Sequence, residues 1–146
     1  MEYEIYIKKK KDIYASIICF FEATDEFLDE YQTLIQNIEK YEILKDKDDF
    51  LDMLKLISKI VDNHNRCSNF FIKLEKIFQY IFNDKNIMTT NSDLISIFGE
   101  NVIILLILLK NKIIKIDDSF LQFIMEKKNA NGLKYSLFLY KEIKEY

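Results

Sequence analysis

The side chains that could carry out catalysis or hold a metal ion are few in this 146-residue sequence. The only histidine, His64, lies in the polar stretch DNHNR, and the two cysteines, Cys19 and Cys67, show no CxxC or Cys/His spacing. General acid–base catalysis needs a base held by a partner, and zinc sites need Cys and His ligands at short spacings. We therefore predict that His64 is a surface residue and that the chain is not an enzyme and uses no metal or cofactor.

Three short segments resemble reactive motifs but lack a required residue. The acidic run DKDD would place Leu51 at the sixth position of a calcium loop begun at Asp46, where the EF-hand needs glycine. Asp117 and Asp118 are adjacent acids of the kind that cap helices. FGEN has one glycine, Gly99, and cannot form the nest of amides that a phosphate loop provides. These acids are therefore predicted to begin helices.

The composition favours one all-α domain over residues 1–146. Proline is absent and only two glycines occur, whereas sandwiches and barrels need many Gly/Pro turns. The net charge is −3 with acids and bases interspersed, which argues against nucleic acid as a partner. Two cysteines without a framework fit a reduced, cytosolic chain. We see no secretory signal or hydrophobic anchor at either end and expect no membrane attachment.

Apolar residues recur at helical spacing along most of the chain. Preceding polar residues give the predicted N-caps: Thr24 for the second helix, Asn91 or Ser92 for a short helix DLISIF, and Asp117 or Asp118 for a later one. NANG, with Gly132, should end that later helix. The stretch YEIYI alternates like a strand but has no partner strand. The predicted helices cover about 9–21, the segment after Thr24, the segment after DKDD up to a break at 62–66, 70–82, 93–98, 102–109, the segment after 117–118, and a last one from Leu133.

The segment FGENVIILLILLKNK contains eight consecutive apolar residues, Val102 to Leu109. A helix of that length spans only about 12 Å, far short of the roughly 20 residues that cross a bilayer. A short helix that is apolar on every side must be surrounded by other elements. We predict that it is the buried central helix of the domain. Phe70 to Phe82 also carries more apolar residues than one inward stripe needs, and the excess could line a surface groove.

The stretch SDLISIFGENVIILLILL, residues 92–109, resembles the BH1 region of the Bcl-2 family. Ile97-Phe98 stands where that family has a Leu-Phe pair, Gly99-Glu100-Asn101 is similar to its turn, and Val102 is similar to the valine that begins its central helix. The family's Asn-Trp-Gly-Arg signature would fall on residues 103–106, so Leu106 replaces the arginine. The chain is similar to poxviral Bcl-2-like proteins in length and in its abundance of residues that have A/T-rich codons, such as Ile, Asn and Lys.

This resemblance implies a Bcl-2-like bundle of about seven helices around the apolar one. It implies a viral pro-survival protein that acts in the host cytoplasm or at mitochondria and sequesters pro-apoptotic BH3 helices of Bim, Bax or Bak type. The alternative from the same family is an immunomodulator that blocks NF-κB signalling through a surface without BH3 binding. Homodimerisation stays open. The candidate groove residues, of which half could be core, are Phe71, Leu74, Phe78, Ile81, Ile95, Phe98, Asn101, Val102 and Leu106.

Overall fold

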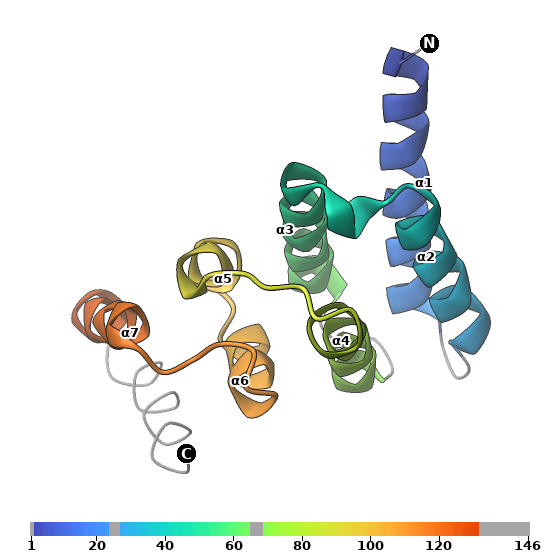
Figure 1. Cartoon of the computed structure of the whole chain (residues 1–146). Helices are drawn as coiled ribbons and strands as arrows, with labels where there is room; N and C mark the ends of the chain where they lie inside the picture. Colours follow the sequence, from blue (N-terminus) through green and yellow to red (C-terminus); the bar gives the residue numbers. More distant parts are fainter. Residues whose placement is uncertain (1, 24–26, 65–68, 132–146) are drawn as a thin grey trace. The chain divides into compact units, whose positions relative to one another are not determined.

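The computed structural model describes residues 2–23, 27–64 and 69–131, and every regular element within them is helical (Figure 1). Seven α-helices, one 3-10 turn and one π-helix occur in these ranges, so the prediction of an all-α protein is confirmed. The chain divides into two compact units, residues 1–76 (unit 1) and 77–146 (unit 2).

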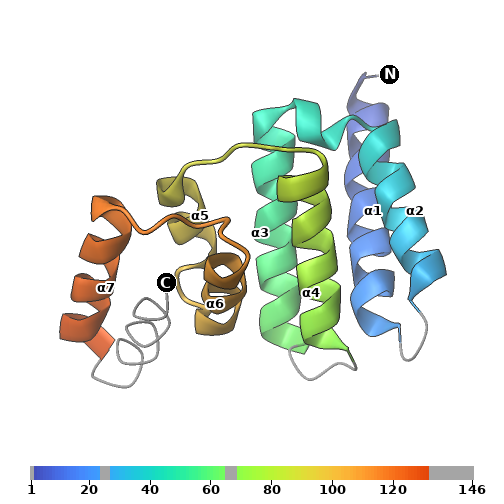
Figure 2. The same ribbon diagram turned by 60° about the horizontal axis from the view of Figure 1, so that its bottom comes forward.

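Unit 1 is built on α1 (Glu2–Glu22), which packs along α2 (Leu28–Lys40) and against α3 (Lys47–His64) (Figure 2). A 3-10 turn, η1 (Ile43–Lys45), connects α2 to α3, and the unit ends within α4 (Phe70–Phe78). The core is formed by apolar residues at helical spacing on each helix. On α1 and α3 these buried residues are Ile13, Ile17, Phe20, Phe21, Phe50, Met53, Leu54, Ile57, Ile60 and Val61.

The start of α1 differs from the prediction. The helix begins at Glu2 rather than near residue 9, so YEIYI is helical and not strand-like. Glu2 and Glu4 lie in the first turn, where acids complement the positive end of the helix dipole. The described residues offer no strand with which this stretch could pair. The predicted cap at Thr24 lies outside the described residues.

Acids begin α3 and also attach it to α1. The Asp49 amide donates a hydrogen bond of 3.1 Å to the Asp46 carboxylate, so DKDD caps a helix as predicted. Lys9 forms an ion pair with Asp49 at 2.6 Å, and Lys10 forms one with Asp52 at 2.9 Å. The break predicted over 62–66 is wrong at its start, because α3 continues to His64.

A buried lysine on α4 closes the C-terminal end of α1. Lys73 is fully buried, and its Nζ donates hydrogen bonds to the carbonyl oxygens of Phe21, at 3.0 Å, and Ala23. The last carbonyl groups of a helix have no partner within the helix, and a cation there also complements the helix dipole. Lys73 therefore joins the end of one helix to the side of another within unit 1.

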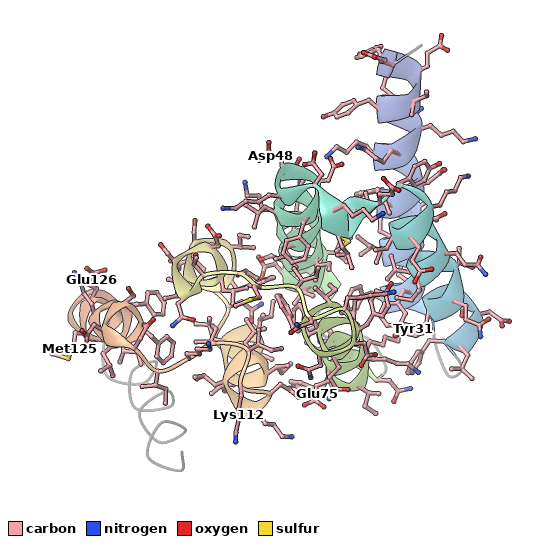
Figure 3. All side chains as sticks on the ribbon, in the orientation of Figure 1. Tyr31, Asp48, Glu75, Lys112, Met125 and Glu126 are labelled. Atoms are coloured by element: carbon pink, nitrogen blue, oxygen red, sulfur yellow. The ribbon has the colours of Figure 1, made fainter. Side chains whose placement is uncertain are left out.

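Unit 2 begins at the end of α4 and continues as a π-helix, η2 (Gln79–Asp84). α5 (Asn91–Phe98) then packs against both α6 (Val102–Lys110) and α7 (Asp118–Asn131). Met125 and Glu126 lie on the outer side of α7 (Figure 3) and are exposed. Because α7 ends at Asn131, most of NANG is helical. Gly132 and the predicted last helix lie outside the described residues.

The helix starts in unit 2 agree only partly with the predicted caps. Thr90, not Asn91 or Ser92, caps α5, because its hydroxyl oxygen accepts a 3.1 Å hydrogen bond from the Asp93 amide. Asn91 instead bonds the backbone of Lys115 in both directions, at 2.5 and 3.1 Å, which ties α5 to the loop before α7. Asp117 caps α7 as predicted, and the hydrogen bond from the Phe120 amide lowers the pKa of its carboxyl group.

Gly99 ends α5 at a position where space, not backbone conformation, requires glycine. Its φ is −61°, but an added Cβ would lie 2.4 Å from the Ile95 carbonyl oxygen and 3.2 Å from the Phe123 ring. We expect Gly99→Ala to lower the free energy of unfolding by about 1–3 kcal/mol in urea denaturation, because the backbone must shift. The control is Ser96→Ala on the exposed side of α5, which should change the free energy by less than about 0.5 kcal/mol. Equal stability of the two variants would contradict the close approach.

Candidate functional site

The segment that resembles BH1 forms two helices joined by a tight turn. α5 ends at Phe98, Gly99 and Glu100 form the turn, and α6 begins after Asn101. The Asn101 side-chain oxygen accepts a 3.2 Å hydrogen bond from the Ile104 backbone amide. The backbone amide of Asn101 donates a hydrogen bond of 2.9 Å to the Phe98 carbonyl oxygen. Asn101 is therefore an N-cap whose extended backbone sets the start of the apolar helix.

The apolar helix is buried on most sides but has one accessible edge. Ile104, Leu105, Leu108 and Leu109 are completely buried, and Ile107 nearly so. Ile103 and Leu106 are half-buried and Lys110 is exposed. These three residues follow one another at intervals of three and four, so they lie on the same side of α6. One stripe of α6 is therefore not enclosed. The side chain of Val102 is not among those described.

Four of the nine predicted groove residues are fully buried. Leu74 belongs to the core of unit 1, whereas Phe78, Ile81 and Phe98 belong to unit 2. The rings of Phe78 and Phe98 meet edge to face with centroids 5.7 Å apart. These side chains pack the interior in this conformation and present no surface to a ligand.

Other predicted groove residues are accessible. Ile95, Asn101 and Leu106 are half-buried on three successive parts of unit 2: α5, the turn and α6. Phe71, on the part of α4 that belongs to unit 1, is 55% exposed, as is its neighbour Ile72 at 57%. Phe71 is therefore one of the apolar residues in excess of the inward stripe of its helix, whereas Lys73 is fully buried. Unit 2 thus brings three of the nine residues to successive accessible positions.

The π-helix η2 follows α4 and contains the predicted groove residue Ile81. The neighbours of Ile81 in the sequence, Tyr80 and Phe82, are also buried in the core. Its first residue, Gln79, donates a hydrogen bond of 3.2 Å to the side chain of Asn111 at the end of α6. Wide helical turns of this kind occur often at functional sites. Apolar spacing did not reveal it, because the inward pattern from Phe70 onward fits an ordinary α-helix almost as well.

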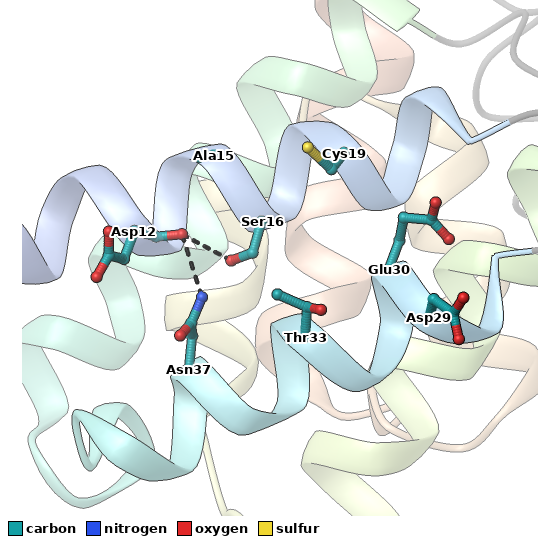
Figure 4. A pocket seen from close by; sticks show the side chains of 8 residues that line it. All are labelled: Asp12, Ala15, Ser16, Cys19, Asp29, Glu30, Thr33 and Asn37. Carbon is teal, nitrogen blue, oxygen red and sulfur yellow. Dashed lines mark hydrogen bonds between the residues drawn. The ribbon is translucent and has the colours of Figure 1, made fainter.

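An open cavity of about 360 Å3, which was not predicted from the sequence, lies between α1 and α2 (Figure 4). The Asp12 carbonyl oxygen accepts hydrogen bonds from Ser16 and Asn37 there, at 2.8 and 3.5 Å. The Asp12 carboxylate accepts a hydrogen bond from the Tyr41 hydroxyl, which raises the pKa of Tyr41. The small residues Ala15, Ser16 and Cys19 on one side of α1 were the available signal. The remaining lining residues are Asp29, Glu30 and Thr33.

No group of three His, Cys, Asp or Glu side chains within the described ranges is placed to share a metal ion. None of the helices that the structure describes combines the length and apolar character needed to cross a bilayer. In comparisons with known proteins, the chain matches no family model, no curated protein and no solved structure.

Proposed function

We propose that this protein is a viral Bcl-2-like protein that sequesters amphipathic BH3 helices of pro-apoptotic host proteins. The observation that supports the proposal most is the conformation of residues 92–109: a short helix, a tight turn and an apolar helix capped by Asn101. Ile95, Asn101 and Leu106 stay accessible on these consecutive elements. The layout agrees with the BH1-like reading of the sequence.

The proposed recognition is that of a helix in a groove. An amphipathic ligand helix places apolar anchors at intervals of three and four residues, and half-buried apolar side chains such as Ile95 and Leu106 can receive them. Burying several hundred Å2 of apolar surface at roughly 25 cal/mol per Å2 offsets the cost of ordering a disordered ligand. In the Bcl-2 family the arginine pairs with an aspartate of the BH3 helix. Because Leu106 stands at the position of that arginine, the ligand aspartate has no cation to pair with at that position.

A second function is favoured by the burial of Leu74, Phe78, Ile81 and Phe98. If these residues remain core, the groove is closed and BH3 helices find too few contacts. The protein would then act as an immunomodulator that blocks NF-κB signalling through an outer surface. The two functions make opposite predictions for peptide binding.

The deciding experiment is calorimetric titration of the full chain with a panel of BH3 peptides. We expect at least one peptide to bind with a Kd below about 10 μM, and Leu106→Ala to weaken it roughly thirtyfold, which is the usual cost of losing an anchor contact. Leu121→Ala, which makes the same change at an exposed position of α7, is the control and should bind as the unmodified chain does. Replacing the ligand aspartate by alanine should have little effect.

Two outcomes would contradict the proposal. If no peptide binds more tightly than about 10 μM while the protein inhibits NF-κB signalling in cells, the second function takes its place. If peptides bind but Leu106→Ala and Leu121→Ala behave alike, the binding surface lies elsewhere than on α5 and α6.

A further inference from the structure

The open cavity between α1 and α2 exists because both helices present short side chains to it (Figure 4). Ala15, Ser16 and Cys19 line it from α1, and Thr33 lines it from α2. Because these side chains are short, space remains between the two helices. The volume of about 360 Å3 lies within the range of about 300–1,000 Å3 that is usual for small-molecule sites. The cavity is therefore large enough to hold a small ligand.

The two ends of the cavity are acidic. Figure 4 shows Asp12 beside Asn37 at one end, and Asp29 and Glu30 at the other end, toward Cys19. Cys19 follows Asp12 by seven residues on α1, and Asn37 follows Glu30 by seven residues on α2. At 1.5 Å per residue, the two ends therefore lie roughly 10 Å apart along the helices. No lysine or arginine is among the described residues that line the cavity.

The carboxylates at these ends have no cation beside them in the described part of the chain. None of Asp12, Asp29 and Glu30 forms an ion pair with another described residue. Asp12 and Glu30 are half-buried, so water surrounds them less completely than it surrounds an exposed side chain. The Tyr41 hydroxyl donates a hydrogen bond to Asp12 but carries no positive charge. A carboxylate that is partly removed from water is stabilised by a nearby positive charge, which the cavity leaves room for.

The shape of the cavity indicates what kind of cation fits. A metal ion does not, because no group of three acidic, His or Cys side chains among the described residues is placed to share one. The carboxylates lie at opposite ends, so a ligand that neutralises both ends must be elongated and positively charged at each end. Between the ends, the methyl groups of Ala15 and Thr33 line the space and suit an alkyl chain. A linear polyamine has this distribution of charge.

We propose that the cavity between α1 and α2 binds a linear polyamine such as spermidine. One terminal ammonium group donates hydrogen bonds to Asp29 and Glu30, and the other donates to the Asp12 carboxylate. The alkyl chain lies along Ala15 and Thr33. Charge-assisted contacts at the two ends of a flexible ligand give a modest affinity, with a Kd on the order of 0.1–1 mM.

Titration of the isotope-labelled full chain with spermidine, followed by NMR, measures the affinity and locates the site. We expect saturable shifts of the backbone amide signals of residues 12–19 and 29–37, which contain the residues that line the cavity. Glu30→Gln should weaken binding about tenfold, because it removes a charged acceptor and keeps the size of the side chain. Glu126→Gln, the same change at an exposed position of α7, is the control and should leave the Kd unchanged.

Ala15→Leu distinguishes a cavity from a surface that is merely acidic. The leucine fills part of the space without changing any charge, and the exposed position of Ala15 allows the larger side chain in the folded protein. We expect this variant to bind spermidine at least about tenfold more weakly. Ala15→Ser keeps the side chain short and should bind as the unmodified chain does. Far-UV circular dichroism checks that the helices of each variant are intact.

Butylamine, which has a single ammonium group, tests whether both ends are used. It should bind at least about tenfold more weakly than spermidine, and equal affinities would overturn the two-ended arrangement. Shifts that do not saturate, or binding that neither Ala15→Leu nor Glu30→Gln weakens, would overturn the cavity as the site. Tighter binding of N-acetyl-arginine amide than of spermidine would show that the cavity receives a side chain of a protein partner instead. None of these results depends on BH3 binding.

Discussion

Lys73→Met should destabilise the protein by about 2–4 kcal/mol, although it replaces a buried charge with an apolar side chain of similar length. Urea denaturation of the full chain, followed by far-UV circular dichroism, measures the change. The loss should appear as a lower denaturation midpoint at an unchanged slope, since the surface exposed on unfolding stays nearly the same.

The expected cost arises from the acceptors that Lys73 serves. Its ammonium group donates to the carbonyl oxygens of Phe21 and Ala23 at the end of α1, and it lies 5.8 Å from the centre of the Phe27 ring. Methionine would fill the space but donate nothing, so carbonyl groups at a largely enclosed helix end would lose their partner. Leaving such acceptors unpaired costs more than the hydrogen bonds themselves contribute.

Lys76→Met provides the matched control, one turn further along α4. Lys76 is half-buried, and its Nζ lies 4.6 Å from the centre of the Tyr31 ring, a cation–π contact. Its loss should cost only about 0.5–1 kcal/mol. If Lys73→Met costs no more than Lys76→Met, or if it raises stability, the buried lysine does not hold the end of α1.

The helical class could be predicted from the sequence because apolar residues at helical spacing record which side of each helix is buried. Phe50, Leu54, Ile57 and Val61 on α3 are buried as that spacing requires. The inward role of Lys73 could not be predicted, since its carbonyl acceptor at Phe21 lies 52 residues earlier in the chain. A lysine between Ile72 and Leu74 is expected at the surface unless that long-range partner is known.

The helix boundaries and the π-helix were harder to predict for local reasons. Thr90, Asn91 and Ser92 are all good capping residues, and only the position of Lys115 shows that Asn91 is engaged in a different contact. YEIYI alternates like a strand, but strand pairing needs a partner that the sequence does not reveal. The π-helix η2, which begins at Gln79, cannot be recognised from the spacing of the apolar residues.

The candidate site was harder to predict for a different reason, because a groove and a core use the same residue types. Phe78 and Phe98 were predicted as groove residues, yet they pack against each other with no exposed surface. Asn101 is a polar residue directly before an apolar run, and this pattern is enough to indicate its role as an N-cap. Which apolar side chains stay accessible depends on the packing of all the helices.

The two leucines Leu106 and Leu108 allow that distinction to be measured on one helix with one chemical change. Leu108→Ala removes a fully buried side chain and should lower the free energy of unfolding by about 2–5 kcal/mol, through lost burial and the cavity left behind. Leu106→Ala, at a half-buried position, should cost about 1 kcal/mol or less. Urea denaturation of the two variants and the unmodified chain gives both values.

The comparison also decides whether Leu106 can serve a ligand. A residue that contacts a partner helix must be removable without unfolding the protein, so a small stability cost for Leu106→Ala together with weaker peptide binding would assign it to the surface of α6. Equal losses of stability for Leu106→Ala and Leu108→Ala would instead place both side chains in the core. In that case α6 is enclosed on every side, and the binding surface proposed on α5 and α6 has no apolar anchor on its central helix.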